Sequence, residues 1–190
     1  FDKLVFGDLG WGDELFFATL MTITVSILSM GLGLCLAIIT VWAKLITNRI
    51  TRLIANFYTT VVRGVPELLV IYLIFFGGNS VVMSVAKLFG YNGYIELNAL
   101  TIGTIAIAFI SATYSSEVIR AAYLAVNKGQ VEAAKALGLN KIQIFLRVMG
   151  PQIIRHALPG IGNVWQITLK DTSLISVTGL VEIMRQTRIA

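Results

Sequence analysis

The stretch LFFATLMTITVSILSMGLGLCLAIITVWA, residues 15–43, decides the fold of this chain because it contains no charged side chain. As a helix rising about 1.5 Å per residue, it exceeds the roughly 30 Å thickness of a bilayer's hydrocarbon core. It holds Gly31, Gly33 and other small residues, at spacings that let helices approach one another closely in lipid. The stretch therefore predicts a membrane-spanning helix that packs against another helix.

The composition of the whole chain also indicates a lipid environment. Of 190 residues, 56% are hydrophobic and 13% are charged, and the mean hydropathy is +0.81. Such a chain has too little polar surface to cover a water-soluble domain. The net charge of +5 does not indicate nucleic acid, because the basic residues form two clusters between apolar runs. The lone cysteine, Cys35, lies within an apolar run and excludes an intrachain disulfide.

Further apolar segments follow the first. Uncharged runs cover residues 68–86 and 97–116, and their helices are expected to extend beyond these limits. A weaker segment has Pro159 near its start and is interrupted by Lys170 and Asp171. We therefore expect an all-α, polytopic transmembrane helical bundle that forms a single domain. The expected spans are residues 15–43, 53–86, 97–126 and 153–180.

The charges between the spans orient the chain. The first 14 residues carry a net charge of −3, with Lys3 against Asp2, Asp8, Asp13 and Glu14. Residues 44–63 and about 118–156 are basic. The basic residues of these two segments are Lys44, Arg49, Arg52, Arg63, Arg120, Lys128, Lys135, Lys141, Arg147 and Arg155. Because basic loops stay in the cytoplasm, we expect the N-terminus and residues 77–96 to lie outside.

The segment KGQVEAAKALGLNKIQIFLRVMGPQ, residues 128–152, is polar and basic, and the orientation above places it in the cytoplasm. Strong helix formers predict a helix over residues 131–137 that ends at Gly138, since glycine suits the position after a helix. Ala133 and Ala134 add little side-chain bulk to that helix. Another surface could therefore come close to it.

A second short helix is expected directly after the first. Asn140 can cap it, with Gln143 three residues further on in a capping-box arrangement. Gly150 and Pro151 are expected to stop it. A solvated connecting loop would need neither these caps nor two adjacent alanines. A docking element for a cytosolic partner is therefore the better interpretation of residues 128–150.

At these residues the chain resembles the membrane-spanning permease subunits of bacterial ATP-binding-cassette (ABC) importers. Their cytoplasmic signature is Glu-Ala-Ala, three further residues and a glycine, followed later by a proline. Here EAA at residues 132–134 precedes Gly138, and Pro151 falls at the expected distance. Gly150 stands where the general signature has a leucine, a departure that should loosen the turn and leave the docking segment intact.

Other motifs narrow the resemblance to the polar amino-acid uptake branch. They are SSEVIRAAYLAVNKGQ (115–130), PQIIRHALPGIGN (151–163) and LKDTSLISVTGL (169–180). The stretch YTTVVRGVPELLVIYLIFFGG (58–78) most resembles permeases for histidine, basic amino acids and opines. Many relatives in the wider branch carry a leucine where this chain has Glu67 and a glutamine where it has Val70. The resemblance runs from about Trp11 to the end.

This resemblance implies the type I importer permease fold, with five spans, the last of which would follow the four expected here. It also implies an inner-membrane location and a dimer with a second, identical or similar permease subunit. Two cytosolic ATPases would dock on the cytoplasmic loops and bind ATP and Mg²⁺, so that this chain itself binds no cofactor. A periplasmic binding protein would deliver the solute, a polar and basic amino acid or an opine. Transport would follow an alternating-access cycle.

The resemblance and the local pattern together give a set of docking residues. Gly138 allows the turn, and the alanines allow insertion into a groove of the ATPase. The expected ATPase contacts are Glu132, Ala133, Ala134, Lys135, Leu137, Gly138 and Lys141.

The charged residues within the spans give a second set. Lys170 and Asp171 would each cost ~2.5–3.5 kcal/mol in hydrocarbon, so they should face protein or water. They could pair with one another, lie at the periplasmic mouth, or line the translocation path, which we favour. Glu67 follows Pro66 at a helix start, where it is stabilised by the helix N-terminus or else meets a cationic substrate. The expected path residues are Arg63, Glu67, Lys170, Asp171, Thr172 and Ser173.

Other polar residues have simpler interpretations. Glu117 and Arg120 lie three residues apart on one helical face, as a surface ion pair or as a structural or gating pair. Pro151 and Pro159 are expected to be structural. The lone histidine, His156, has no second ligand at metal spacing, so no metal site is expected.

Two other classes of function fit the sequence less well. The sequence contains no metalloprotease motif, no GxSxG and no phosphate-binding loop, so the chain is not expected to be an enzyme and ATP must be hydrolysed by another chain. An ion-coupled secondary amino-acid transporter is the alternative, since acids within the membrane could carry protons. It predicts inverted repeats within one chain, which this sequence does not show, and it gives no reason for a capped docking helix.

Overall fold

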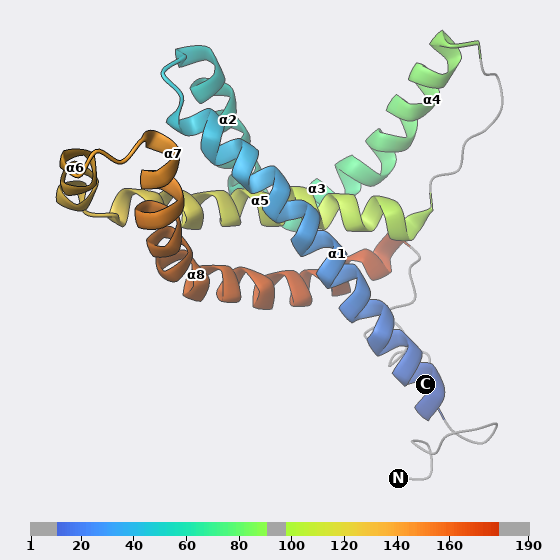
Figure 1. Cartoon of the computed structure of the whole chain (residues 1–190). Helices are drawn as coiled ribbons and strands as arrows, with labels where there is room; N and C mark the ends of the chain where they lie inside the picture. The colour runs from blue at the N-terminus through green and yellow to red at the C-terminus, as the bar shows by residue number, and fades with distance from the viewer. Residues whose placement is uncertain (1–10, 91–97, 179–190) are drawn as a thin grey trace.

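The computed structural model describes residues 11–90 and 98–178, and every regular element within them is helical, which confirms the all-α prediction (Figure 1). Asp2, Asp8 and the last two residues of the expected fourth span lie outside the described residues. The α-helices are α1 (Gly12–Leu45), α2 (Arg49–Gly64), α3 (Glu67–Tyr72), α4 (Gly78–Leu88), α5 (Ala99–Ala125), α6 (Lys128–Ala136), α7 (Lys141–Ile144) and α8 (Gly150–Asp171). Two π-helical turns, Leu73–Gly77 and Phe145–Met149, and a 3₁₀ helix, Thr172–Thr178, continue them.

Three helical stretches among the described residues are long and apolar enough to cross a membrane. They are α1, the continuous stretch Glu67–Ser84, and α5. The expected fourth span corresponds to α8, whose more polar sequence includes Arg155 and Lys170. The most apolar helices are therefore α1, α3 with its continuation, and α5.

The centre of the bundle is the crossing of α1 over α5 (Figure 1). Ser29 Oγ donates a hydrogen bond to the Thr104 carbonyl over 3.1 Å. Gly33 lies so close to α5 that a Cβ there would overlap Ser111 Oγ and lie 3.1 Å from the Ala108 carbonyl. Hydrophobic burial does not drive helices together in lipid, so small residues that permit close packing take over that role.

Helix α8 packs along the other side of α5, as Figure 1 shows. The contact is close at both ends, because a Cβ on Gly160 would overlap the Val118 side chain and one on Gly103 would overlap Ile175. Ile175 is fully buried in the 3₁₀ helix that follows α8. The central helix α5 is thus held from two sides by α1 and α8.

The expected second span, residues 53–86, contains a break that the apolar pattern did not reveal. Helix α2 ends at Gly64, and Val65 and Pro66 are both extended in ψ, at 142° and 131°. Proline disfavours helical geometry in the residue before it and cannot donate a backbone hydrogen bond, so the chain starts a new helix at Glu67. The chain then passes Gly77 and Gly78 without a further break.

The expectation that Gly150 and Pro151 stop a helix is wrong. Helix α7, the π-helical turn and α8 form one continuous helical run. The Gly150 N–H reaches the Phe145 carbonyl, five residues back, and this wider turn accommodates the missing N–H of Pro151. A Cβ on Gly150 would lie 3.0 Å from the Phe145 carbonyl oxygen, so glycine suits this turn better than the leucine of the general signature.

Gly33 and Gly31 give a matched test of the α1–α5 contact. We expect Gly33→Leu to lower the free energy of unfolding by about 1–3 kcal/mol, because the added side chain forces the two helices apart. Gly31→Leu should have little effect, since nothing lies within 4 Å of a Cβ at that position. Unfolding of the purified chain in mild detergent, followed by titration with a denaturing detergent, measures both. Equal destabilisation by the two variants would contradict this packing.

Candidate functional site

The polar segment at one end of the bundle is built by local rules. Asn127 Oδ1 accepts a hydrogen bond of 2.8 Å from the Gly129 N–H and so caps the start of α6. At its end, Gly138 adopts φ +77°, and its N–H and that of Leu139 donate to the Lys135 and Ala134 carbonyls. This is the Schellman arrangement, which satisfies the last carbonyls of a helix. The predicted helix end at Gly138 is confirmed.

The start of α7 also follows the predicted pattern. The Gln143 N–H donates to Asn140 Oδ1 over 2.9 Å, and the Asn140 N–H donates to Gln143 Oε1 over 3.0 Å. These two bonds form the capping box expected from the sequence. The end of α6 and the start of α7 are therefore both defined by local hydrogen bonds, and Figure 1 shows the two helices near the C-terminal end of α5.

The predicted docking residues differ in how much of each is exposed. Leu137 is 82% exposed, whereas Ala134 is only 4% exposed and packs within the chain. The two adjacent alanines are thus not equivalent, because Ala133 faces outward and Ala134 holds α6 in place. The docking residues with exposed side chains or backbone are Glu132, Ala133, Lys135, Leu137, Gly138 and Lys141.

One polar contact joins this segment to α8. The Gln152 side-chain amide donates to the Gln130 side-chain oxygen in α6 and, over 2.7 Å, to the Val148 carbonyl. Gln130 lies in the first turn of α6 and Gln152 in the first turn of α8. The contact links the docking segment to a helix that packs along the centre of the bundle.

A second polar cluster surrounds Tyr114 of α5. The Arg63 guanidinium at the end of α2 lies over the Tyr114 ring, 5.4 Å from its centroid. The Tyr114 hydroxyl donates to Glu67 Oε1, at the start of α3, over 3.1 Å. The Glu67 side chain also lies close to Asp171 at the end of α8. Three predicted path residues from three separate helices are thereby brought together, around a tyrosine that the sequence did not single out.

The other predicted path residues lie within two residues of Asp171 in sequence. Lys170 is exposed, and no ion pair joins it to Asp171 in the part of the chain that the structure describes. Thr172 and Ser173 hydroxyls each donate over 2.7 Å, to the carbonyls of Leu169 and Lys170. These hydroxyls satisfy the end of α8.

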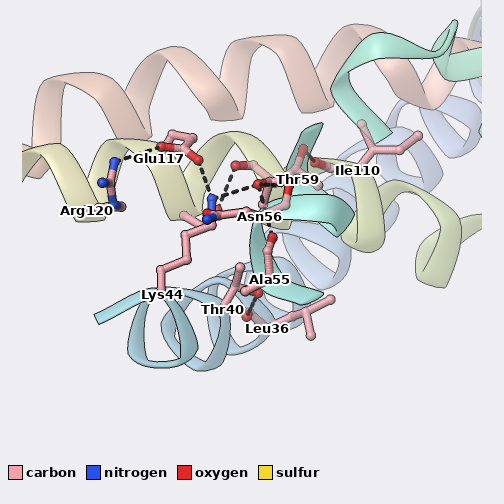
Figure 2. Close-up of polar contacts among 11 residues, drawn as sticks. Leu36, Thr40, Lys44, Ala55, Asn56, Thr59, Ile110, Glu117 and Arg120 are labelled. Carbon is pink, nitrogen blue, oxygen red and sulfur yellow. Dashed lines mark hydrogen bonds and ion pairs between the residues drawn. The ribbon is translucent and has the colours of Figure 1, made fainter. Parts of the chain in front are cut away.

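A third cluster, shown in Figure 2, centres on Lys44 in the last turn of α1. Its side chain is only 3% exposed. Its Nζ donates over 2.7 Å to Thr59 Oγ1 of α2 and also bonds to the Glu117 carboxylate of α5. Arg120 Nη1 lies 3.7 Å from the other Glu117 oxygen, which places the predicted Glu117–Arg120 pair in contact. The network joins α1, α2 and α5.

Sequence reasoning placed Lys44 in a basic loop, because its charge ended the apolar run. The available signal was its position, since a lysine in the last turn of a spanning helix must find a partner or extend to the interface. Its burial carries a desolvation cost that only a paired acceptor offsets. Glu117 is therefore a structural necessity for this arrangement, whatever further role it has.

An open cavity of about 490 Å³ lies between the second and third clusters. Thr59 and Arg63 lie one turn apart on α2, and Tyr114 and Glu117 lie one turn apart on α5, so the two helices face each other with polar side chains. The residues lining the cavity are Thr59, Thr60, Arg63, Gly64, Tyr114 and Glu117. None of the described residues form a group of three or more metal ligands.

A bundle of apolar helices with a polar cavity between α2 and α5 and a capped polar segment at one end is typical of a membrane permease. The chain belongs to the family described as binding-protein-dependent transport system inner membrane components, whose model matches residues 29–190. The predicted resemblance to permease subunits of ABC transporters is confirmed. The chain is therefore an inner-membrane transport component.

Individual relatives cover nearly the whole chain. The nopaline transport system permease protein NocQ of Agrobacterium fabrum is 53% identical over 183 residues, which are 96% of this chain and 78% of that protein. The octopine transport system permease protein OccQ of Rhizobium radiobacter is 45% identical over 184 residues, 97% of this chain and 78% of that protein. The histidine/lysine/arginine/ornithine permease HisQ of Escherichia coli is 39% identical over 181 residues, 95% and 79% of the two chains.

A solved structure shows the same fold. The crystal structure of an amino acid ABC transporter with histidines matches with a TM-score of 0.78 and 30% sequence identity. The match covers 94% of this chain and 78% of that chain. The helical bundle described above is thus the permease fold of an amino acid ABC transporter.

The Lys44–Glu117 pair predicts an asymmetric response to substitution. Glu117→Gln leaves the Lys44 charge buried without a counter-charge, so we expect it to lower the free energy of unfolding by about 3 kcal/mol or more. Lys44→Met should cost less, because Glu117 is partly exposed and keeps Arg120 nearby. The double variant should be more stable than Glu117→Gln alone, as detergent unfolding would measure. Strict additivity of the two single changes would mean that the pair is not coupled.

Proposed function

We propose that this chain is a permease subunit of an ATP-driven importer that carries basic amino acids or opines across the bacterial inner membrane by alternating access. The observation that carries the proposal is the cluster of Arg63, Glu67 and Asp171 around Tyr114, on membrane helices beside an open cavity. The printed names of the relatives support the solute class, since they transport nopaline, octopine and basic amino acids.

The chemistry of the cluster favours a cation. Glu67 and Asp171 come from different helices and lie close together, and two neighbouring carboxylates repel each other when both are ionised. An ammonium or guanidinium group between them would offset one of the two negative charges and relieve the repulsion. Lys170, Thr172 and Ser173 lie beside Asp171 and would provide further polar groups along the path.

The structure of the docking segment supports the proposal that another protein supplies the energy for transport. Helix α6 exposes Glu132, Ala133 and Lys135, and its ends are fixed by hydrogen bonds, so a partner could push it as a rigid unit. We propose that a cytosolic ATPase dimer docks there and that ATP and Mg²⁺ bind to the ATPases. A push on α6 would reach α8 through the Gln130–Gln152 contact.

The remaining partners follow from the family. A second similar permease subunit, identical or not, would complete the translocation path, and a periplasmic binding protein would deliver the solute. The N-terminus would be periplasmic, because the basic segments around Lys44 and α6 belong on the cytoplasmic side. Glu117 and Arg120 would act as a gating or structural pair, and Pro151 and Pro159 as structural residues of α8.

A substitution at Glu67 tests whether this carboxylate meets the cationic group of the solute. We expect Glu67→Gln to reduce uptake of arginine and histidine by about 10-fold or more, since a hydrogen bond to a charged group contributes ~1.5–3 kcal/mol. Uptake of a neutral polar amino acid should fall less. Glu14→Gln, which changes an exposed acid in the first turn of α1, is the control. An equal loss for all solutes would show that Glu67 only stabilises the start of α3.

Gly138 tests the docking role of α6. We expect Gly138→Trp to leave the chain inserted in the membrane but to reduce copurification with the ATPase and ATP-driven uptake, because it adds bulk at an exposed turn. Gly138→Asn is the control, since asparagine tolerates the positive φ of +77° and adds less volume. Normal uptake by Gly138→Trp would contradict the docking assignment.

A further inference from the structure

The cavity between α2 and α5 holds a cation that has no ion-pair partner among the described residues. Arg63 and Glu117 line the cavity, and Lys44 and Arg120 flank Glu117. Each Glu117 oxygen already lies beside one of the two flanking cations. Within the described residues, Arg63 has no ion pair, and its recorded contact is with the Tyr114 ring. Arg63 is thus the cation of this cavity that lacks an anion.

We propose that Arg63 binds the carboxylate of the transported solute, which lies with its acidic end in the α2–α5 cavity and its cationic end at Glu67 and Asp171. This inference rests on the proposed function and adds the orientation of the solute and a role for one residue.

The position of the guanidinium suits this role. The guanidinium lies over the Tyr114 ring, and its N–H donors make no hydrogen bond or ion pair with another described residue, so they are available to an acceptor. A planar guanidinium matches a carboxylate with two parallel hydrogen bonds, which a lysine cannot offer. Thr59 and Thr60 also line the cavity. Tyr114 lies between the sites proposed for the acidic and the cationic ends of the solute, because its ring faces Arg63 and its hydroxyl donates to Glu67.

The volume of the cavity would also allow solutes larger than a simple amino acid. Its volume of about 490 Å³ corresponds to on the order of 15 water molecules, far more than one carboxylate needs. A second carboxylate beside the first would therefore fit within reach of Arg63. The class defined by the two ends is a guanidinium or ammonium compound with one or two carboxylates opposite the cation.

The test uses the assembled transporter in lipid nanodiscs without its binding protein, with ligand affinity measured by calorimetry. The ligands are arginine, its decarboxylated analogue agmatine, and octopine, which carries a second carboxylate. We expect Arg63→Gln to weaken arginine binding by about 10–100-fold, the equivalent of one charge-assisted contact. Octopine should lose at least as much, and agmatine binding should stay unchanged because agmatine lacks the group that Arg63 would hold.

Two further variants make the result specific. Arg52→Gln removes an exposed cation from the same helix without touching the cavity, and it should leave all three affinities unchanged. Arg63→Lys keeps the charge and loses the paired geometry, so it should show a smaller loss for arginine and none for agmatine.

The possible outcomes separate this inference from the proposed function. Wild-type affinity for arginine in Arg63→Gln, or equal losses for arginine and agmatine, would overturn the role of Arg63 and leave the importer assignment standing. If the unaltered transporter binds none of the three ligands and imports none of them with its binding protein, the proposed function itself fails.

Discussion

A polar group inside a bilayer finds no water to bond with, and the arrangement of α1, α2 and α5 follows from that constraint. Tyr58 of α2 donates to the Phe109 carbonyl of α5 over 2.6 Å, and Ser29 of α1 donates to the Thr104 carbonyl. Other hydroxyls, such as that of Thr40, bond to the carbonyl four residues back in their own helix. Polar side chains therefore either remain within one helix or hold two helices together, and the cavity lies where several of them meet.

The break before Pro66 separates charges that an unbroken helix would bring together. On a continuous helix, Arg63 and Glu67 would lie four residues apart on one face, the spacing at which opposite charges pair. The extended residues Val65 and Pro66 turn the chain, so that Arg63 ends α2 while Glu67 starts α3. The two side chains then meet different parts of Tyr114. A single proline thus keeps an acid and a base close without letting them neutralise each other.

The sequence predicted those features that depend on nearby residues. The long uncharged runs predicted α1 and α5, and the turn at Gly138 and the Asn140 capping box follow from local hydrogen bonds. The cost of charge in lipid pointed to Glu67 and Asp171, but their contact depends on how α3 and α8 pack on α5, and so does the role of Tyr114. The Lys44–Glu117 pair was missed for the same reason, since its partners are 73 residues apart. The helix start after Pro66 was visible in the sequence, whereas the continuous helix through Pro151 depends on a wider backbone turn that residue patterns do not encode.

The unbroken run from α7 into α8 has a mechanical consequence. The 22 residues of α8 form a rod about 33 Å long, with Gln152 near one end and Asp171 at the other. A tilt of about five degrees at the first end sweeps the far end through about 3 Å, close to the length of one hydrogen bond. Small swings of this lever arm are therefore sufficient to open or close the contact between Asp171 and Glu67, and no part of the rod has to unwind.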